Sequence, residues 1–269
     1  MPAVDLITAD RIRHGERLLA AVREAGALAL GKFRSPLKVW MKGSSSPVCE
    51  ADIAVNELLQ DRLDKAADGF GWLSEESVDD SARMQARQLW VIDPIDGTRA
   101  YIAGRPDWSI SAALVQQGRP IVAALFAPVT DEMFFAIAGS GATLNGSPIR
   151  VSDGTLDGAR VAGPAGYLNR LRTIDPRLVA TPKIHSLALR FARVAQGGID
   201  AAFASHNSHD WDLAAADLLV HEAGGALTTF AGKTLIYNRA DPIHESLLAA
   251  GRNRHVALVD LVRGRRIDS

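Results

Sequence analysis

The sequence predicts a mixed α+β fold that grades into α/β. Strand-like and helix-like segments alternate along the chain, and the first half also contains consecutive apolar strands joined by short turns. The chain has 269 residues, 47% of them hydrophobic, which is enough to bury a large core. Since neither repeats nor a low-complexity linker interrupt it, we expect a single domain, 1–269, with approximate subdomains 1–155 and 156–269.

The first half is predicted to place helices around an antiparallel meander. Apolar residues at helical spacing predict helices at 10–33 and 50–66. Short apolar runs predict strands at 70–77, 88–93 and 132–139, and a pair of strands around a Gln-Gly-Arg-Pro turn at 108–128. A hairpin with Asn145-Gly146 at its tip follows, because this dipeptide favours a two-residue turn.

The second half is predicted to alternate helices and strands. Helical character is found at 186–198 and 211–225, and strand character at 199–205 and 226–232. The stretches 164–176 and 205–210 are polar or irregular, and we expect them to be loops on the substrate side of a site.

Charge and composition exclude several classes of protein. The formal net charge is -1 and the isoelectric point is about 6.7, so nothing favours a nucleic-acid polymer or an anionic membrane as partner. Cys49 is the only cysteine, so no intramolecular disulfide can form. The first residues carry charges where a secretory signal needs an apolar run, and no stretch is long enough to span a membrane. We expect a soluble, cytoplasmic protein.

The stretch WVIDPIDGTRAYIAG, residues 90–104, carries the strongest chemical signal. An apolar strand runs into Asp93, and Pro94 is expected to end the ladder because it has no N–H to donate. Asp93 and Asp96 then flank a tight bend, where both carboxylates can converge on one point. Mg2+ takes a few carboxylates and completes its shell with water and substrate phosphate.

Gly97 and Thr98 follow these acids and suggest an anion cradle. Gly97 lets the backbone approach a ligand closely, and amides at the start of a helical turn bind phosphate. A purely structural alternative is equally compatible with this fragment: Asp96 starts an Asx turn and Asp93 caps the strand.

Further acids lie at the ends of other predicted elements. Glu75 and Glu76 end a strand, and Asp212 stands just before an apolar helical run. Taken singly, Asp212 would be an N-cap and the glutamates a solvated turn. Taken together with Asp93 and Asp96, they supply the carboxylates that a site for two or three metal ions requires.

These motifs together resemble the inositol monophosphatase family of metal-dependent, lithium-sensitive phosphatases. SEES (74–77) is similar to the paired glutamates of the family, and WVIDPIDGTRAYI (90–102) to its first signature. WDLAAADLLVHEAGG (211–225) is similar to its second signature, and GSGATLNGSPIRVS (139–152) to the hairpin between them. The resemblance covers nearly the whole chain. It implies a layered sandwich like those of inositol monophosphatase and fructose-1,6-bisphosphatase.

The resemblance also implies roles for individual residues. It implies metal ligation by the side chains of Glu75, Asp93, Asp96 and Asp212 and by the carbonyl of Ile95. Gly97 and Thr98 would bind the substrate phosphate. Catalytic roles would fall to Glu75 and Thr98, which hold the attacking water, and to Asp52, which supports that threonine.

Three residues are weaker candidates on the substrate side. Lys42 lies near where family members keep a lysine on a mobile active-site loop, although the spacing from Lys42 to Asp52 varies in the family. Ser205 and His209 belong to a polar loop that precedes Asp212, and this loop could equally be plain surface.

The implied reaction is hydrolysis of a small phosphate monoester with two or three Mg2+ ions, by a cytoplasmic homodimer that Li+ inhibits. The expected substrates are 3'(2'),5'-bisphosphate nucleotides or inositol 1-phosphate, with histidinol phosphate and fructose 1,6-bisphosphate as alternatives. A different class of function stays open as well, namely a catalytically silent, ligand-binding regulator with the same fold.

Overall fold

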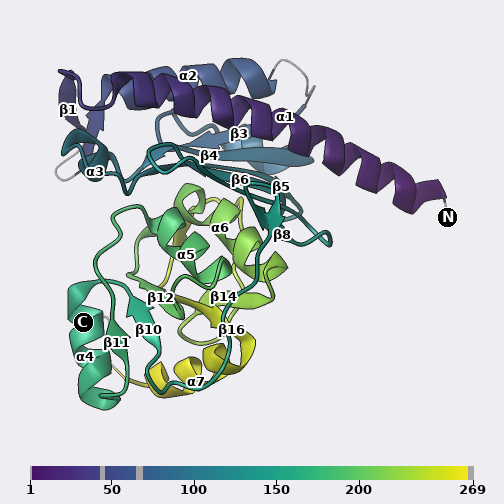
Figure 1. The fold of residues 1–269 in the computed structure, drawn as a ribbon. Coiled ribbons are helices and arrows are strands. Elements are labelled where there is room, and N and C mark those ends of the chain that lie inside the picture. The colour runs from purple at the N-terminus through teal and green to yellow at the C-terminus, as the bar shows by residue number, and fades with distance from the viewer. Residues whose placement is uncertain (1, 43–45, 65–68, 266–269) are drawn as a thin grey trace.

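The computed structural model describes residues 2–42, 46–64 and 69–265, and it stacks helices and sheets in layers (Figure 1). A seven-stranded sheet lies between an outer and an inner pair of helices, and a five-stranded sheet lies on the other side of the inner pair. The predicted mixed sandwich is confirmed.

The seven-stranded sheet is the predicted meander, in the order β3-β4-β5-β6-β7-β8-β9. Its strands are β3 (Gly71–Ser74), β4 (Gln88–Asp96), β5 (Ser109–Gln116), β6 (Arg119–Ala127), β7 (Glu132–Ile137), β8 (Ala142–Leu144) and β9 (Ser147–Pro148), with a 3-10 turn η1 (Ser81–Gln85) before β4. Only β3 and β4 pair in parallel within this sheet. The predicted hairpin tip is confirmed, because Asn145 and Gly146 both have positive φ.

Two helices cover the outer face of this sheet: α1 (Pro2–Lys32) and α2 (Glu50–Asp64). Leu18 and Val22 of the predicted apolar face are fully buried against it, whereas Ile12 is 45% exposed. A two-stranded ladder of β1 (Val39–Lys42) and β2 (Ser46–Cys49) and the short helix α3 (Thr98–Ile102) lie at one end of this layer (Figure 1). Within the described residues, no helix combines the length and the apolar character that crossing a bilayer would require.

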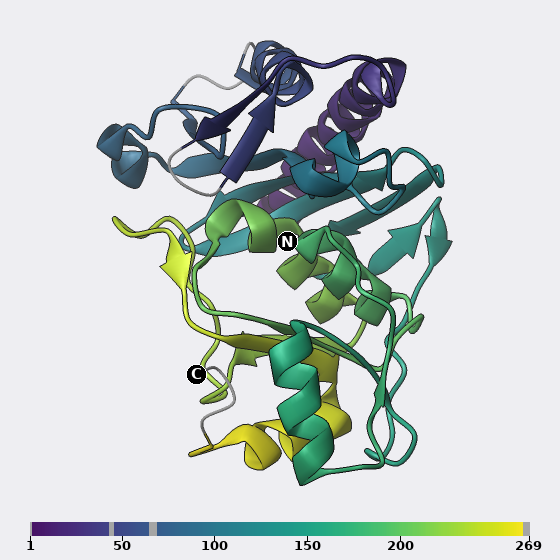
Figure 2. The ribbon, with the colours of Figure 1, turned by 90° about the vertical axis from the view of Figure 1, so that its left-hand side faces the viewer.

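The five-stranded sheet has the order β11-β10-β12-β16-β14. Its strands are β10 (Arg160–Ala162), β11 (Val179–Ala180), β12 (Ala201–Ala204), β14 (Gly225–Thr229) and β16 (Leu247–Gly251), and a separate ladder joins β13 (Ser208–His209) to β15 (Ile243–His244). The helices are α4 (Ala165–Ile174), α5 (Leu187–Ala195), α6 (Asp210–Glu222) and α7 (Arg252–Val262). Helices α5 and α6 fill the space between the two sheets, while α4 and α7 pack on the outer face of the smaller one (Figure 2).

The prediction of a loop at 164–176 is wrong, because most of this stretch is helix α4. Its three buried side chains, Tyr167, Leu168 and Leu171, have the i, i+1, i+4 spacing of a one-sided helix. They pack against β10, β12 and α7. The stretch 205–210 is partly regular too, since it includes β13 and the first residue of α6.

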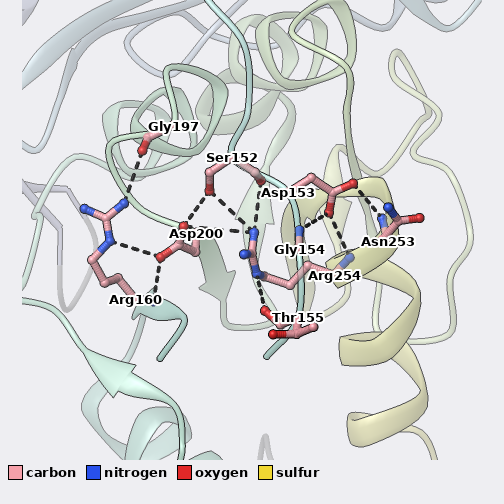
Figure 3. Close-up of polar contacts among 9 residues, drawn as sticks. All are labelled: Ser152, Asp153, Gly154, Thr155, Arg160, Gly197, Asp200, Asn253 and Arg254. Carbon is pink, nitrogen blue, oxygen red and sulfur yellow. Dashed lines mark hydrogen bonds and ion pairs between the residues drawn. The ribbon is translucent and has the colours of Figure 1, made fainter. Parts of the chain in front are cut away.

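A polar network joins the start of β10 to the C-terminal helix (Figure 3). The carboxylate of Asp200 accepts hydrogen bonds from the side chains of Ser152 and Arg160. The carboxylate of Asp153 accepts from the backbone amides of Asn253 and Arg254 and so caps α7. The network therefore ties helix α7 to the chain that precedes β10.

Candidate metal centre

Parallel pairing of β3 with β4 brings the first two acids of the site together. The carboxyl ends of parallel strands meet at one edge of a sheet, and here Ser74 lies opposite Ile92. Glu75 directly follows Ser74 and Asp93 directly follows Ile92. The Glu75 amide donates a hydrogen bond to the Ile92 carbonyl at 3.2 Å. Residues almost twenty positions apart in sequence therefore present their carboxylates side by side.

Pro94 does not end the ladder, contrary to the prediction from sequence. Strand β4 pairs with β5 at Asp93 opposite Ser111, then shifts register and pairs again at Asp96 opposite Ser109. The shift leaves Pro94 and its neighbour bulged, so the missing N–H costs no ladder bond. The bulge also lets Asp93 and Asp96 project toward the same region.

Gly97 and Thr98 turn the chain from the bulge into α3. Gly97 has φ of 95°, and a Cβ there would lie 3.2 Å from the Ser186 amide nitrogen, so conformation and space both favour glycine. The hydroxyl of Thr98 lies 3.0 Å from Asp52 Oδ1 and 3.0 Å from the Ile95 carbonyl. Asp52 therefore contacts the threonine that the resemblance pairs with it.

Asp96 is held by the start of helix α5. Its carboxylate accepts hydrogen bonds from the Ser186 hydroxyl and the Ala188 amide at 2.6 Å each, and from the Leu187 amide at 3.1 Å. Those amides belong to the first helical turn, which has no acceptor of its own for them. A carboxylate from β4 thus caps a helix from the second half of the chain.

Asp212 comes from the first turn of α6, but it is not the N-cap that its sequence position suggested. His209 is the N-cap, and Asp212 is the third helical residue of a capping box, accepting from the His209 amide at 2.7 Å. The Ser111 hydroxyl donates to the Trp211 carbonyl at 3.2 Å, which fastens this turn to the strand opposite Asp93.

Three carboxylates converge where these elements meet. Asp93, Asp96 and Asp212 each offer one oxygen, and these oxygens all lie within 4.8 Å of one another. Asp93 Oδ1 is buried and has no hydrogen-bond partner among the described residues. A buried carboxylate oxygen without a partner is costly unless a cation satisfies it. The donor set consists of hard oxygens, which suits Mg2+ or Ca2+ rather than a soft metal.

Burial raises the pKa of each acid at this centre, and repulsion from neighbouring carboxylates adds to this effect at Glu75, Asp93 and Asp212. Burial and the nearby Asp212 and Glu76 charges raise the pKa of Glu75 to about 8. Burial and the Asp96 charge raise the pKa of Asp212 to about 7. Burial followed by the charges of Glu75 and Asp96 raises the pKa of Asp93 well above its usual range. Bound divalent cations would offset this repulsion, so the residues present are suited to the metal that the resemblance implies.

Most of the predicted site residues line one cavity of about 210 Å³: Glu75, Asp93, Ile95, Asp96, Gly97, Thr98 and Asp212. Lys42 lies at its edge, because its ammonium contacts the Glu75 carbonyl and lies 3.6 Å from the Glu76 carboxylate. Ser205 lines a neighbouring cavity instead. His209 lines neither of these two cavities; its ring stacks on Trp211 with 4.5 Å between centroids.

Sequence reasoning missed four residues of this region. Arg99, Lys183 and His185 line the cavity, and Ser186 holds Asp96. Ser186 precedes an apolar helical run and could have been recognised as an N-cap. No comparable local signal marked Lys183 or His185, because their segment reaches the acids only through the packing of α5 against the larger sheet.

Both the sequence and the structure of this chain are similar to those of known proteins. The family model "Inositol monophosphatase family" matches residues 15–263. An inositol-1-monophosphatase of Rhizobium meliloti (strain 1021) is 33% identical over 253 residues, which cover 89% of this chain and 91% of the relative. The Nus factor SuhB of Escherichia coli (strain K12) is 34% identical over 224 residues, covering 79% and 83%.

A solved structure agrees with these sequence relatives. The extragenic suppressor protein SuhB from Bartonella henselae matches with a TM-score of 0.83 and 28% identity, over 93% of this chain and 98% of that one. The match of the family model over nearly the whole chain, the relatives and the shared fold agree with the two acidic signatures. The chain therefore belongs to the inositol monophosphatase family.

Proposed function

We propose that this protein hydrolyses a small phosphate monoester with the help of Mg2+. The observation that carries the proposal is the convergence of Asp93, Asp96 and Asp212 around a buried Asp93 oxygen that has no partner among the described residues. Thr98 lies beside this cluster in the same cavity, with its hydroxyl oriented by Asp52 and the Ile95 carbonyl.

The site residues have different proposed roles in the reaction. Glu75, Asp93, Asp96, Asp212 and the Ile95 carbonyl would hold two or three Mg2+ ions. When bound, the metal neutralises phosphoryl oxygens, lowers the pKa of a coordinated water and stabilises the leaving oxygen. Thr98 and Glu75 orient the attacking water, and the amides of Gly97 and Thr98 bind the phosphate.

A thiol nucleophile has no place in this proposal. Cys49 is fully buried, and burial together with the neighbouring Asp52 charge raises the pKa of its thiol to about 12. The thiolate that covalent catalysis needs is therefore absent near neutral pH.

The proposed substrates are 3'(2'),5'-bisphosphate nucleotides or inositol 1-phosphate, with histidinol phosphate and fructose 1,6-bisphosphate as alternatives. We further propose a cytoplasmic homodimer that Li+ inhibits and that binds neither nucleic-acid polymers nor membranes.

A second candidate function comes from the relatives named Nus factor SuhB. A catalytically silent regulator would need the same fold but would not need to hydrolyse a substrate. The side chains of Glu75, Asp93, Asp96, Asp212 and Thr98 all line one cavity, and this complete set supports the enzyme over a silent regulator.

The test is a phosphate-release screen of the purified protein over inositol 1-phosphate, 3'-phosphoadenosine 5'-phosphate, histidinol phosphate and fructose 1,6-bisphosphate. We expect turnover of at least one substrate with added Mg2+ and none after treatment with a chelator. Full activity in chelator would refute the metal mechanism, and no activity under any condition would favour the regulator.

A further inference from the structure

The segment 181–186 lies between the metal centre and a second cavity, and both of its ends are anchored. The Thr181 amide donates to the Val161 carbonyl of β10 at 2.9 Å. At the other end, the Ser186 amide donates to the carbonyl of Asp107, just before β5, at 3.2 Å. In between, the guanidinium of Arg190 donates to the Ile184 carbonyl at 2.8 Å. The segment therefore has a fixed path from one sheet to the other.

Within this segment, Ile184 packs against the core, while Lys183 and His185 on either side of it line the metal cavity. The Asp107 carboxylate accepts from the His185 amide at 2.8 Å and lies 2.6 Å from His185 Nδ1. This carboxylate–imidazole pair fixes the ring and leaves Nε2 as the nitrogen available to a ligand.

Lys183 lines both cavities, so the two adjoin at this residue. Among the described residues it has neither an acidic partner nor a hydrogen-bond acceptor for its ammonium. The second cavity measures about 650 Å³, large enough for the rest of a small metabolite.

The lining of this second cavity contrasts with that of the metal centre. Among the described residues its lining contains no Asp or Glu, and its polar side chains are cations, hydroxyls and an amide, namely Lys183, Arg190, Thr181, Ser205, Ser208 and Asn169. Acidic acceptors suited to the hydroxyls of a neutral polyol are therefore missing from it, whereas donors suited to an anion are present.

We propose that the preferred substrate carries a second anionic group on its leaving portion, and that Lys183 and the Asp107-held His185 bind this group where the two cavities meet. The inference rests on the proposed phosphatase activity and specifies its substrate class. An anion next to four carboxylates needs a cation close by. Of the residues that the structure describes, Lys183 is a cation without a partner that borders both cavities.

The experiment compares substrates that differ by one phosphate. The pairs are 3'-phosphoadenosine 5'-phosphate with adenosine 3'-monophosphate, and fructose 1,6-bisphosphate with fructose 1-phosphate. Each is assayed with the wild-type protein and with the Lys183→Ala, Lys183→Glu and His185→Gln variants. Lys233→Ala is the matched control, since Lys233 is exposed and lines neither cavity. Melting curves verify that each variant is folded.

We expect the wild type to prefer the bisphosphate at least tenfold in kcat/KM in one or both pairs. Lys183→Ala should reduce that preference to less than threefold, mostly through KM, and Lys183→Glu should reduce it further. His185→Gln should weaken the preference as well, because kcat/KM should fall far more for each bisphosphate than for its monophosphate, and Lys233→Ala should change nothing.

Two results would overturn the inference while leaving the proposed function intact. The first is a wild type with equal kcat/KM for the bisphosphate and the monophosphate of each pair. The second is a set of variants that lower kcat/KM equally for both substrates of a pair. Failure of the proposed function looks different, because then no phosphate is released from any of the four compounds in Mg2+.

Discussion

Asp93 is the residue on which the charge of the metal centre converges. It is fully buried, and the carboxylates of Glu75, Asp96, Asp212 and Asp52 all act to raise its pKa. In the protein without metal, an ionised Asp93 is therefore unfavourable, and bound cations reverse this effect. The charged Asp93 side chain therefore destabilises the metal-free fold and stabilises the metal-bound state.

Replacing Asp93 by Asn should separate these two effects. Asp93→Asn keeps the size and removes the charge, so the metal-free variant should melt at the wild-type temperature or slightly above it. Phosphatase activity at saturating Mg2+ should fall by orders of magnitude, and the rise in melting temperature on adding Mg2+ should shrink or vanish.

Calorimetry with and without Mg2+, beside a turnover assay, checks this prediction. Asp131→Asn is the control, because Asp131 is an exposed acid on a turn and should change neither quantity. An Asp93→Asn protein whose metal-free melting temperature falls in parallel with its activity in Mg2+ would leave Asp93 as a structural cap of its strand.

At the scale of elements, helix α6 contributes to the metal centre at one end and to the core along its length. Its first turn carries Asp212, while Leu213 and Leu219 are completely buried between the sheets. This burial, rather than the cap, provides most of the stability of the helix. A substitution in its first turn can therefore change the site and leave the fold in place.

Asp212→Ala should leave the protein folded and nearly inactive. Loss of the capping-box interaction costs about 1 kcal/mol, whereas loss of a ligand should lower turnover by several orders of magnitude. The matched control is Asp153→Ala, which removes an acid that accepts amides of the first turn of α7 and does not line the metal cavity.

Both variants should show similar small drops in melting temperature, but only Asp212→Ala should lose activity in a Mg2+ titration. Near-normal turnover in Asp212→Ala would reduce Asp212 to a helix cap and remove it from the proposed ligand set.

Asp217, one to two turns further along α6, allows a pH prediction that does not involve metal. It is buried and accepts a hydrogen bond from the Tyr237 hydroxyl at 3.0 Å. Burial raises its pKa to about 6 from an ordinary value of 3.8. The folded state thus binds the proton more tightly, so Asp217 lowers stability as the pH rises from about 4 to about 6.

Asp217→Asn keeps an acceptor for Tyr237 and abolishes this titration. The penalty removed above pH 6 is on the order of 3 kcal/mol for a shift of this size. Urea unfolding at pH 4 and pH 7 should show that wild type and variant diverge as the pH rises, with the variant more stable at pH 7. Parallel curves would show that Asp217 does not titrate in this range.

At the scale of the whole molecule, the metal centre depends on both halves of the chain. Glu75, Asp93 and Asp96 come from the larger sheet, while Asp212 comes from a helix that also packs on the smaller one. Asp96 in turn is held by amides of α5. Because these proposed ligands meet only in the folded protein, bound metal should stabilise the entire fold.

Divalent cations should therefore raise the melting temperature of the full-length protein. Saturation at a hundred times Kd contributes about 2.7 kcal/mol, which corresponds to roughly 5–10 °C for a chain of this size. Ca2+ should stabilise as well but compete with Mg2+ and support no turnover, because it is larger and less strict in geometry.

Scanning calorimetry in chelator, Mg2+ and Ca2+ measures the effect, and Asp93→Asn is the matched control. An unchanged melting temperature in both cations would contradict the assigned centre.

Sequence alone predicted the elements whose patterns are local. The meander, the Asn145-Gly146 hairpin and the helices at α1, α2, α5 and α6 follow from periodicity and turn chemistry. The acids were recognised from short contiguous motifs. Helix α4 was missed, because its short apolar face becomes evident only against the sheet that it covers. Pro94 was read as a strand end, because a bulge depends on the partner strand.

What the sequence by itself determined is the set of chemical groups: hard oxygen ligands at element ends, a glycine able to adopt positive φ, and a threonine beside it. Only the tertiary structure decided which of them meet. Parallel pairing of β3 with β4 joined Glu75 to Asp93, and α5 and α6 between the sheets brought in Ser186 and Asp212. Lys183 and His185 reach the same cavity by this route alone, since contacts between residues far apart in sequence depend on packing that no local pattern encodes.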